Sequence, residues 1–519
     1  MSAQPRRNAD GSQPLTSAQL LAFGFPALTH AMVASPVYAI LPTYYAANTA
    51  VTLAQIGTIA AFSRIIDALN DPVMGHLSDR TRTRFGSRKP WVVGAILFMA
   101  IAVFQLFSPP KDATWLYFLV WSQVLYTGFT MFEVPRSAWS SEITRDYNER
   151  ARIGLYVGGF NIAGSLFFYA VPIVSGLLGG HSRIDGGTLQ LITMVYLLLM
   201  PLGIAVSVWL VPTGAKVEHK QARIRDVLGT IRRSRPAQWF YSASILWGLG
   251  QGVVVGCSFL FYTEYMRLPG HYAIIMVVLF VTEILSLPLW ARILPRFDRH
   301  RVWAFCIGAT ALTGPFILLV PRGEAALLPV LCFVVVRGFL TAPSNFLPGA
   351  VLGDVIDHDI LKSGSNKAGN LFAVHMVLVK IAMATGGAVA FNVLDTMGYR
   401  VGAANSTSAQ TGLLVTYFLI PAIFHIAMAL VAWRFPIARR EQRIIQARAA
   451  DHPGAHCPAQ RAASSERRRL TPPPAPAVKS ARLGMARANP VPQSALAAAA
   501  RRRGGAARSL AAPLAARPR

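Results

Sequence analysis

The amino-acid sequence predicts an all-α polytopic membrane protein with twelve transmembrane helices. Three observations predict this class: 53% of the 519 residues are hydrophobic, only 14% are charged, and most of the charged residues fall between long apolar stretches. Ordinary soluble domains carry about 25% charged residues, so a soluble globule is excluded as the first interpretation. The net charge of +27 does not indicate nucleic-acid binding, because the basic residues lie in loops and in a terminal segment.

Twelve apolar stretches are long enough to cross a bilayer, whose hydrocarbon core of about 30 Å needs roughly 20 helical residues. The first stretch is too long for the apolar region of a signal peptide and no clean cleavage site follows it, so we expect a permanent span. In chain order, the predicted spans are residues 18–43, 52–78, 90–108, 114–139, 151–178, 188–212, 237–263, 271–291, 302–320, 325–347, 369–394 and 410–435.

The basic residues of the loops lie almost entirely on one side of these spans. The side that includes the N-terminus carries 23 Lys and Arg residues, whereas the opposite loops carry 5. Basic loops face the cytoplasm in membrane proteins. We therefore expect both termini in the cytoplasm and the protein to be integral to the plasma (cell inner) membrane.

The longest interior loop is basic, and it divides the chain into two sets of six spans. We expect a cytoplasmic N-terminal segment (1–17), a six-helix half (18–212), a basic central loop (213–236), a second six-helix half (237–440) and a disordered basic cytoplasmic tail (441–519). A weak internal repeat supports the two halves, because GHLSDRTRTRFGSRKPW after the second span resembles LPRFDRHRVW after the eighth. The arginines of the tail suit contact with anionic membrane lipid.

Charged residues inside the spans are the strongest functional signal in the sequence. A single charge at the centre of a bilayer costs roughly 2.5–3.5 kcal/mol, so eight unpaired charges would cost on the order of 20 kcal/mol. The four acids and four bases sum to zero, which predicts that they pair around one polar cavity. These residues are Asp67, Asp71, Glu133, Glu283, Arg64, Arg136, Arg337 and Lys380.

The second span concentrates three of these charges on one helical face. Arg64, Asp67 and Asp71 are spaced i, i+3 and i+7, so the two carboxylates lie one turn apart. Two adjacent carboxylates form a hard-oxygen site for Na⁺, and their mutual repulsion favours binding of H⁺ when no metal ion is present. An internal salt-bridge network of the arginine with the aspartates is the structural alternative.

Four segments resemble a known family. RIIDALNDPVMG and SDRTRTRFGSRKPW resemble the second helix and first cytoplasmic loop of the glycoside-pentoside-hexuronide:cation symporters, the branch of the major facilitator superfamily that includes the melibiose permeases. FTMFEVPRSAWSSEITRDYNERARI and GDVIDHDILKSGSNKAGNLFAV agree with the same family. The resemblance spans roughly residues 18–440. It implies a major facilitator fold with two six-helix halves and transport coupled to a monovalent cation.

The resemblance also implies which side chains bind the cation. The family's cation ligands fall on four oxygen-bearing side chains, Asp67, Asn70, Asp71 and Thr130. The family's lysine of the eleventh helix falls on Lys380, which is expected to neutralise the carboxylates when the cation has left. Arg64 is a second expected coupling charge, because it lies one turn before the first aspartate.

The substrate is expected to be a small solute such as a sugar, a glycoside or a uronate. The helix-four acid of the family falls on Glu133, whereas Ser137 stands where the family has an aromatic platform for the sugar. Arg136, Arg337 and Glu283 are additional charges, which would suit a substrate with its own carboxylate. These five residues form the predicted substrate site.

Two other functions remain open at this stage: transport of a lysolipid or another amphipathic solute, and a non-transporting membrane sensor or scaffold with the same fold. No nucleophile and base pair of an enzyme is recognisable, and no cofactor is expected beyond the coupling Na⁺ or H⁺. The glycines of WGLGQGVVVG in the seventh span follow no strand, so they predict close helix packing and not a nucleotide-binding loop.

Overall fold

The computed structural model describes residues 14–144, 147–214, 224–363, 368–437 and 441, which belong to one compact unit. Within these ranges the ordered segments are helical and no strand occurs. Ten helical stretches are long and apolar enough to cross a membrane. The predicted tail lies outside the described residues, apart from Glu441.

The helices of the first part of the chain are connected by short segments. They are α1 (Ser17–Ala39), α2 (Leu41–Asn48), α3 (Leu53–Arg80), α4 (Lys89–Phe107), α5 (Trp115–Ile143), α6 (Tyr147–Leu177) and α7 (Gly186–Leu210). Threonines begin several of them: Thr16 and Thr52 each form a capping box with the glutamine three residues later. The predicted first span is divided at Ile40, and Pro42 stands in the first turn of α2.

The helices of the second part include short 3₁₀ and π segments. They are α8 (Ile224–Arg233), α9 (Arg235–Leu260), η1 (Phe261–Tyr265), α10 (Tyr272–Ile293), η2 (Leu294–Arg296), α11 (Arg299–Thr313), η3 (Gly314–Leu319), η4 (Glu324–Ala326), α12 (Leu327–Thr341), η5 (Ala342–Asn345), α13 (Leu347–Ser363), α14 (Ala368–Thr396), α15 (Thr407–Leu414), η6 (Val415–Leu419) and α16 (Ile420–Trp433). Part of the predicted central loop is therefore helical, because the α8 sequence IRDVLGTIRR places apolar residues at helical spacing.

Two of the twelve predicted spans are less apolar than the ten stretches that could cross a membrane by length and composition. They correspond to α3 and α5, which are 28 and 29 residues long. At 1.5 Å per residue both exceed the thickness of a bilayer core. Their low hydropathy comes from the charged residues they carry, including Arg64 and Asp67 on α3 and Glu133 and Arg136 on α5.

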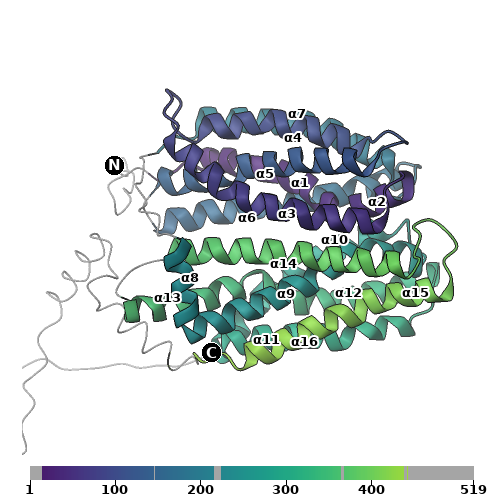
Figure 1. The fold of residues 1–519 in the computed structure, drawn as a ribbon. Coiled ribbons are helices and arrows are strands. Elements are labelled where there is room, and N and C mark those ends of the chain that lie inside the picture. Colours follow the sequence, from purple (N-terminus) through teal and green to yellow (C-terminus); the bar gives the residue numbers. More distant parts are fainter. Residues whose placement is uncertain (1–13, 145–146, 215–223, 364–367, 438–440, 442–519) are drawn as a thin grey trace, which may run out of the picture. The chain divides into compact units, whose positions relative to one another are not determined.

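The helices before and after α8 form two groups whose most extensive contacts are between two pairs of helices. In Figure 1, α3 and α6 of the upper group lie against the lower group, where α3 packs on α14 and α6 packs on α10. The start of α1 and the end of α16 lie at the same end of the helices (Figure 1). Counted by predicted span, the pairing joins the second span of each group to the fifth of the other, which is the reciprocity expected of two related halves.

Within the second group, α9 and α14 pack backbone to backbone. A Cβ atom added at Gly252 would collide with the carbonyl group of Met383, and one added at Gly386 would collide with the carbonyl group of Leu249. The glycines of WGLGQGVVVG therefore serve close helix packing, and this prediction from the sequence is confirmed.

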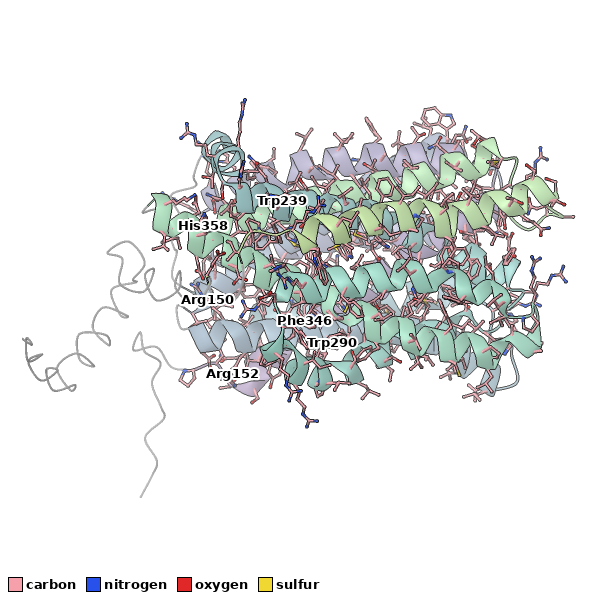
Figure 2. The ribbon with its side chains drawn as sticks, turned by 90° about the horizontal axis from the view of Figure 1, so that it is seen from below. Arg150, Arg152, Trp239, Trp290, Phe346 and His358 are labelled. Carbon is pink, nitrogen blue, oxygen red and sulfur yellow. The ribbon has the colours of Figure 1, made fainter. Side chains whose placement is uncertain are left out.

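A buried ionic network ties several helices together at one end. Arg88 donates hydrogen bonds to Glu142 and Ser78, over 2.9 and 2.7 Å, and Lys89 donates to the carbonyl oxygens of Val208 and Val211 at the end of α7. Arg150, Arg152 and His358 also lie toward one end of the molecule (Figure 2). Basic side chains from both groups thus gather at the end of the helices where the loops are rich in arginine.

Candidate cation and substrate site

A cavity of about 290 Å³ lies between the two groups of helices. Residues of α1, α2, α3 and α5 line it from the first group, and residues of α9 and α14 line it from the second. The charged residues in its lining are Arg64, Asp67, Glu133 and Lys380. A position between the two halves is where transporters with repeated halves place their substrate.

Lys380 connects the two groups of helices electrostatically. Its Nζ lies 3.4 Å from Asp71 Oδ2, 3.8 Å from Asp67 Oδ2 and 3.7 Å from Glu133 Oε2. All three carboxylates come from the first group, on α3 and α5, whereas Lys380 comes from α14 in the second. One ammonium group therefore holds three acids of the opposite half.

The two aspartates on α3 converge on the hydroxyl group of Thr130. Thr130 Oγ1 lies 2.7 Å from Asp67 Oδ1 and 3.1 Å from Asp71 Oδ1. A hydroxyl group has a single proton, so it donates to only one of these oxygens at a time. The contact between Thr130 Oγ1 and the aspartate oxygen that does not receive this proton is repulsive unless another proton or a cation lies between the two atoms. The three oxygens thus define a position that attracts one positive charge.

Arg64 is held in place by aromatic rings as well as by Asp67. Its Nη1 lies 3.2 Å from Asp67 Oδ2. Its guanidinium carbon lies 4.6 Å from the ring centroid of Tyr38 and 4.5 Å from that of Tyr126. The two rings are nearly parallel, with an interplanar angle of 7°. These cation–π contacts fix the arginine beside the carboxylate.

The ion pairs in this cluster leave one negative charge over. Asp67, Asp71 and Glu133 contribute three negative charges, and their partners Lys380 and Arg64 contribute two positive charges. The local sum is therefore −1, which one Na⁺ or one H⁺ would neutralise. A salt bridge between Arg64 and Asp67, as in the structural alternative raised from the sequence, is also present.

The structure brings only five of the eight intramembrane charges together. Glu283 accepts hydrogen bonds from Thr341 and Asn345 within the second group, over 2.8 and 3.2 Å. Arg337 lies over the ring of Tyr417. The single cluster predicted from the zero charge sum is therefore wrong, because Glu283 and Arg337 have other partners in the second group and Arg136 donates to the carbonyl oxygen of Phe23.

Several predicted site residues do not line the cavity. The half-buried Arg136 side chain donates to the carbonyl oxygen of Phe23 over 2.7 Å and packs on Phe23 and Phe132. Ser137 is exposed on α5. Asn70 donates to Thr127 over 3.4 Å, and among the described residues it has no hydrogen bond to Asp67 or Asp71. Arg337 and Glu283 are likewise absent from the lining.

The structure places further residues beside the charged cluster. His30 Nε2 lies 3.6 Å from Glu133 Oε1, and the imidazole ring packs on Phe129 and Phe132. Tyr38 and Tyr126 support Arg64 from helices other than its own. Aromatic residues are common in apolar spans, so only the spatial arrangement distinguishes these two from ordinary packing residues.

A helical membrane protein with a charged cavity between two groups of helices has the architecture expected of a secondary transporter. Residues 22–439 match the model of a family described as MFS/sugar transport protein. This match covers most of the chain, so the protein belongs to that family, and the predicted class of membrane transporter is confirmed.

Curated relatives agree with the predicted symporter family. The chain is 26% identical to the uncharacterized symporter YnaJ of Bacillus subtilis, covering 77% of this chain and 88% of the relative. It is 26% identical to the putative glycoside/cation symporter YagG of Escherichia coli, covering 72% and 82%. It is also 22% identical to the lactose permease of Leuconostoc lactis, covering 74% and 63%. The resemblance to the glycoside-pentoside-hexuronide:cation symporters is thereby confirmed.

Solved structures support the same fold. The nucleoside transporter NupG matches with a TM-score of 0.58 at 13% identity, covering 81% of this chain and 98% of that one. The xylose transporter XylE of E. coli in its inward-open conformation matches with a TM-score of 0.52 at 14% identity, covering 83% and 98%. At these identities the likeness concerns the fold alone.

Proposed function

We propose that this protein is a symporter that moves a small sugar or glycoside together with one monovalent cation by alternating access. The observation that carries the proposal is the convergence of Asp67, Asp71 and Thr130 oxygens in a cluster with a net charge of −1. The family assignment and the relatives named as glycoside/cation symporter, lactose permease and isoprimeverose transporter support the same substrate class.

In the proposed mechanism, the cation competes with Lys380 for the carboxylates. When no cation is bound, the ammonium group on α14 attracts the acids of α3 and α5 and joins the two halves. A cation between Asp67 and Asp71 weakens this attraction, which changes the relative free energy of the two conformations. Coupling of ion occupancy to the position of the halves follows from this competition.

The driving force is sufficient for accumulation of a solute. One positive charge that crosses a potential of about 100 mV releases roughly 2.3 kcal/mol. Because each 1.4 kcal/mol corresponds to a factor of ten, the electrical term alone supports roughly 40-fold inward accumulation of the substrate.

We also propose the topology predicted from the sequence. α3 and α5 would cross the membrane beside the ten apolar stretches, giving twelve spans, because Arg64, Asp67, Asp71 and Glu133 lie in one cluster with Lys380 of the other group. The halves would be residues 18–212 and 237–440, joined by residues 213–236. The basic ends would face the cytoplasm with both termini, in the plasma (cell inner) membrane.

For the substrate, we propose Glu133 and Lys380 as the polar contacts, because both line the cavity. Arg136 and Arg337 lie outside the lining, so a substrate with its own carboxylate has less support than a neutral sugar. Carboxylate and ammonium groups bind the hydroxyl groups of a neutral sugar by charge-assisted hydrogen bonds.

The test is uptake into proteoliposomes that contain the full-length protein. Labelled xylose, lactose and methyl glycosides would be offered with an inward Na⁺ gradient, with an inward H⁺ gradient, or with neither. We expect at least one sugar to accumulate only with one of the gradients, and that cation to stimulate exchange of the same sugar. Absence of both uptake and exchange for all sugars under every gradient would contradict the proposal and favour a non-transporting protein.

A further inference from the structure

The cavity between the two groups of helices is closed at one end of the molecule. We call this the far end, where α6 ends and α10 begins, and we call the arginine-rich end the near end. On the face of α5 that lines the cavity, Phe118, Ser122 and Phe129 lie toward the far end and are 6%, 5% and 4% exposed. Glu133, closer to the near end, has a side chain that is 44% exposed, and Ser137 one turn further is also exposed. The cavity is therefore open toward the near end.

At the far end, α6 of the first group inserts an aromatic ring into the second group. The ring centroid of Tyr169 lies 6.1 Å from that of Tyr272 and 6.1 Å from that of Phe280, both on α10. Tyr169 and Tyr272 are 3% and 0% exposed. Among the residues that the structure describes, no other contact between aromatic rings joins the two groups.

The surface that receives Tyr169 is held in place within the second group. The hydroxyl group of Tyr272 lies 3.1 Å from Ser258 Oγ of α9, at hydrogen-bond distance. The Tyr272 ring packs edge to face on Phe259, with the ring centroids 4.8 Å apart. We name this surface the aromatic socket and define it by Phe259, Tyr272 and Phe280. Because the socket is fixed by its own group, the inserted ring of Tyr169 adds a contact that exists only while the far end is closed.

The other pair of helices meets differently at the far end. A Cβ atom added at Gly57 of α3 would lie 3.0 Å from the carbonyl oxygen of Ala388 on α14. Since glycine has no side chain, nothing on α3 is inserted into α14 at this position. The ion pair of Lys380 with Asp71 lies further toward the near end. Separation of the two groups at the far end therefore requires one inserted ring to be withdrawn, that of Tyr169.

We propose that Tyr169 is the extracellular gate residue of this protein: its ring occupies the aromatic socket while the far end is closed and leaves the socket when the far end opens to admit substrate. This inference rests on the proposed function for alternating access and for the topology that places the far end outside the cell. Contacts between aromatic rings stabilise the closed conformation. Their removal should shift the population toward the conformation that is open at the far end.

The experiment measures access to the cavity from outside the cell. Ser122→Cys places a thiol in the cavity lining, where the native side chain is almost fully buried. A membrane-impermeant thiol reagent is added to intact cells, and the labelling rate of the purified full-length protein is compared among variants. Variants that retain Ser122 give the background from the native cysteines. We expect Tyr169→Ala to accelerate labelling about tenfold, whereas Tyr169→Phe, which keeps the ring, should label at nearly the parental rate.

Two further variants separate gating from a general loss of packing. Phe280→Ala removes the socket from the opposite group and should also accelerate labelling, so the test does not depend on recovery of Tyr169→Ala. Tyr156→Ala makes the same truncation on α6 toward the near end and should leave the rate at the parental value. A parental rate in folded Tyr169→Ala and Phe280→Ala proteins would overturn the proposal, and so would equal acceleration by Tyr156→Ala.

Failure of this inference is distinguishable from failure of the proposed function, because labelling requires neither substrate nor coupling cation. If Tyr169→Ala accelerates labelling and no sugar is taken up under any gradient, the gate stands and the proposed substrate class fails. If sugar uptake is coupled to a cation and labelling is the same in all variants, the symporter stands and the gate assignment fails.

Discussion

Substitution of Asp71 by asparagine tests the cation site most directly. The change removes one negative charge and keeps the size of the side chain, so the local sum of −1 becomes zero. One unit charge about 4 Å from a bound cation contributes roughly 4 kcal/mol at an effective dielectric constant of 20. That energy corresponds to nearly a thousandfold in affinity, so we expect Asp71→Asn to lose measurable cation binding.

Asp67→Asn should differ from Asp71→Asn in stability. The Asp67 side chain is 4% exposed and pairs with Arg64, whereas Asp71 is 17% exposed and pairs with Lys380. Removal of one partner of a buried ion pair costs about 3–5 kcal/mol. Both variants should lose cation-dependent uptake, and only Asp67→Asn should also unfold at a clearly lower temperature.

The assay is the shift of unfolding temperature of the purified protein as NaCl is titrated, or as pH is varied at constant salt, followed by uptake in proteoliposomes. Asp112→Asn, at an exposed position of the loop before α5, is the matched control. Folded Asp71→Asn protein with the cation affinity and coupled uptake of the wild type would refute the assignment of the cation to this pair.

Three further predictions follow from neighbouring contacts. Lys380→Ala removes the competing ammonium group, so cation binding measured by the same thermal titration should become at least tenfold tighter while gradient-driven uptake is lost; weaker binding would contradict the competition. Tyr126→Leu removes a cation–π contact of Arg64 worth about 0.5–2 kcal/mol and should weaken cation binding by roughly 2-fold to 30-fold, whereas Tyr126→Phe should keep most of it. Gly252→Val should prevent recovery of monodisperse protein, because its Cβ has no space, while Gly154→Val, with open space at that position, should be tolerated.

Much of the fold was predictable because the bilayer imposes one length and one polarity on each span. The apolar stretch predicted at 90–108 corresponds to α4 (Lys89–Phe107), and the one at 188–212 to α7 (Gly186–Leu210). The irregular elements were not predictable in the same way. η5 interrupts the tenth apolar stretch where Pro343 removes a backbone donor, and the helix continues to Ser363, beyond the end expected from hydropathy.

The cation site was predictable to the extent that its residues are neighbours along one helix. Arg64, Asp67 and Asp71 share a face through helical spacing alone, and the family resemblance added Thr130 and Lys380. The contacts of Tyr38 and His30 were not predictable, because nothing in their local sequence distinguishes them from packing residues. Their distances to Arg64 and Glu133 depend on how α1 lies beside α3 and α5.

The positions of the intramembrane charges explain why the sequence predicted a charged cavity but wrongly placed all eight charges in it. A zero sum over all spans is what insertion into a membrane favours, since each uncompensated charge is costly. The cation site has the opposite requirement, because a site without net negative charge does not attract a cation. The structure meets both requirements by keeping Arg136, Arg337 and Glu283, whose formal charges sum to +1, outside the group around Lys380, so that a neutral whole contains a part with one negative charge in excess. Any substitution that restores local neutrality at this part should therefore remove ion coupling even where the total charge of the spans moves away from zero.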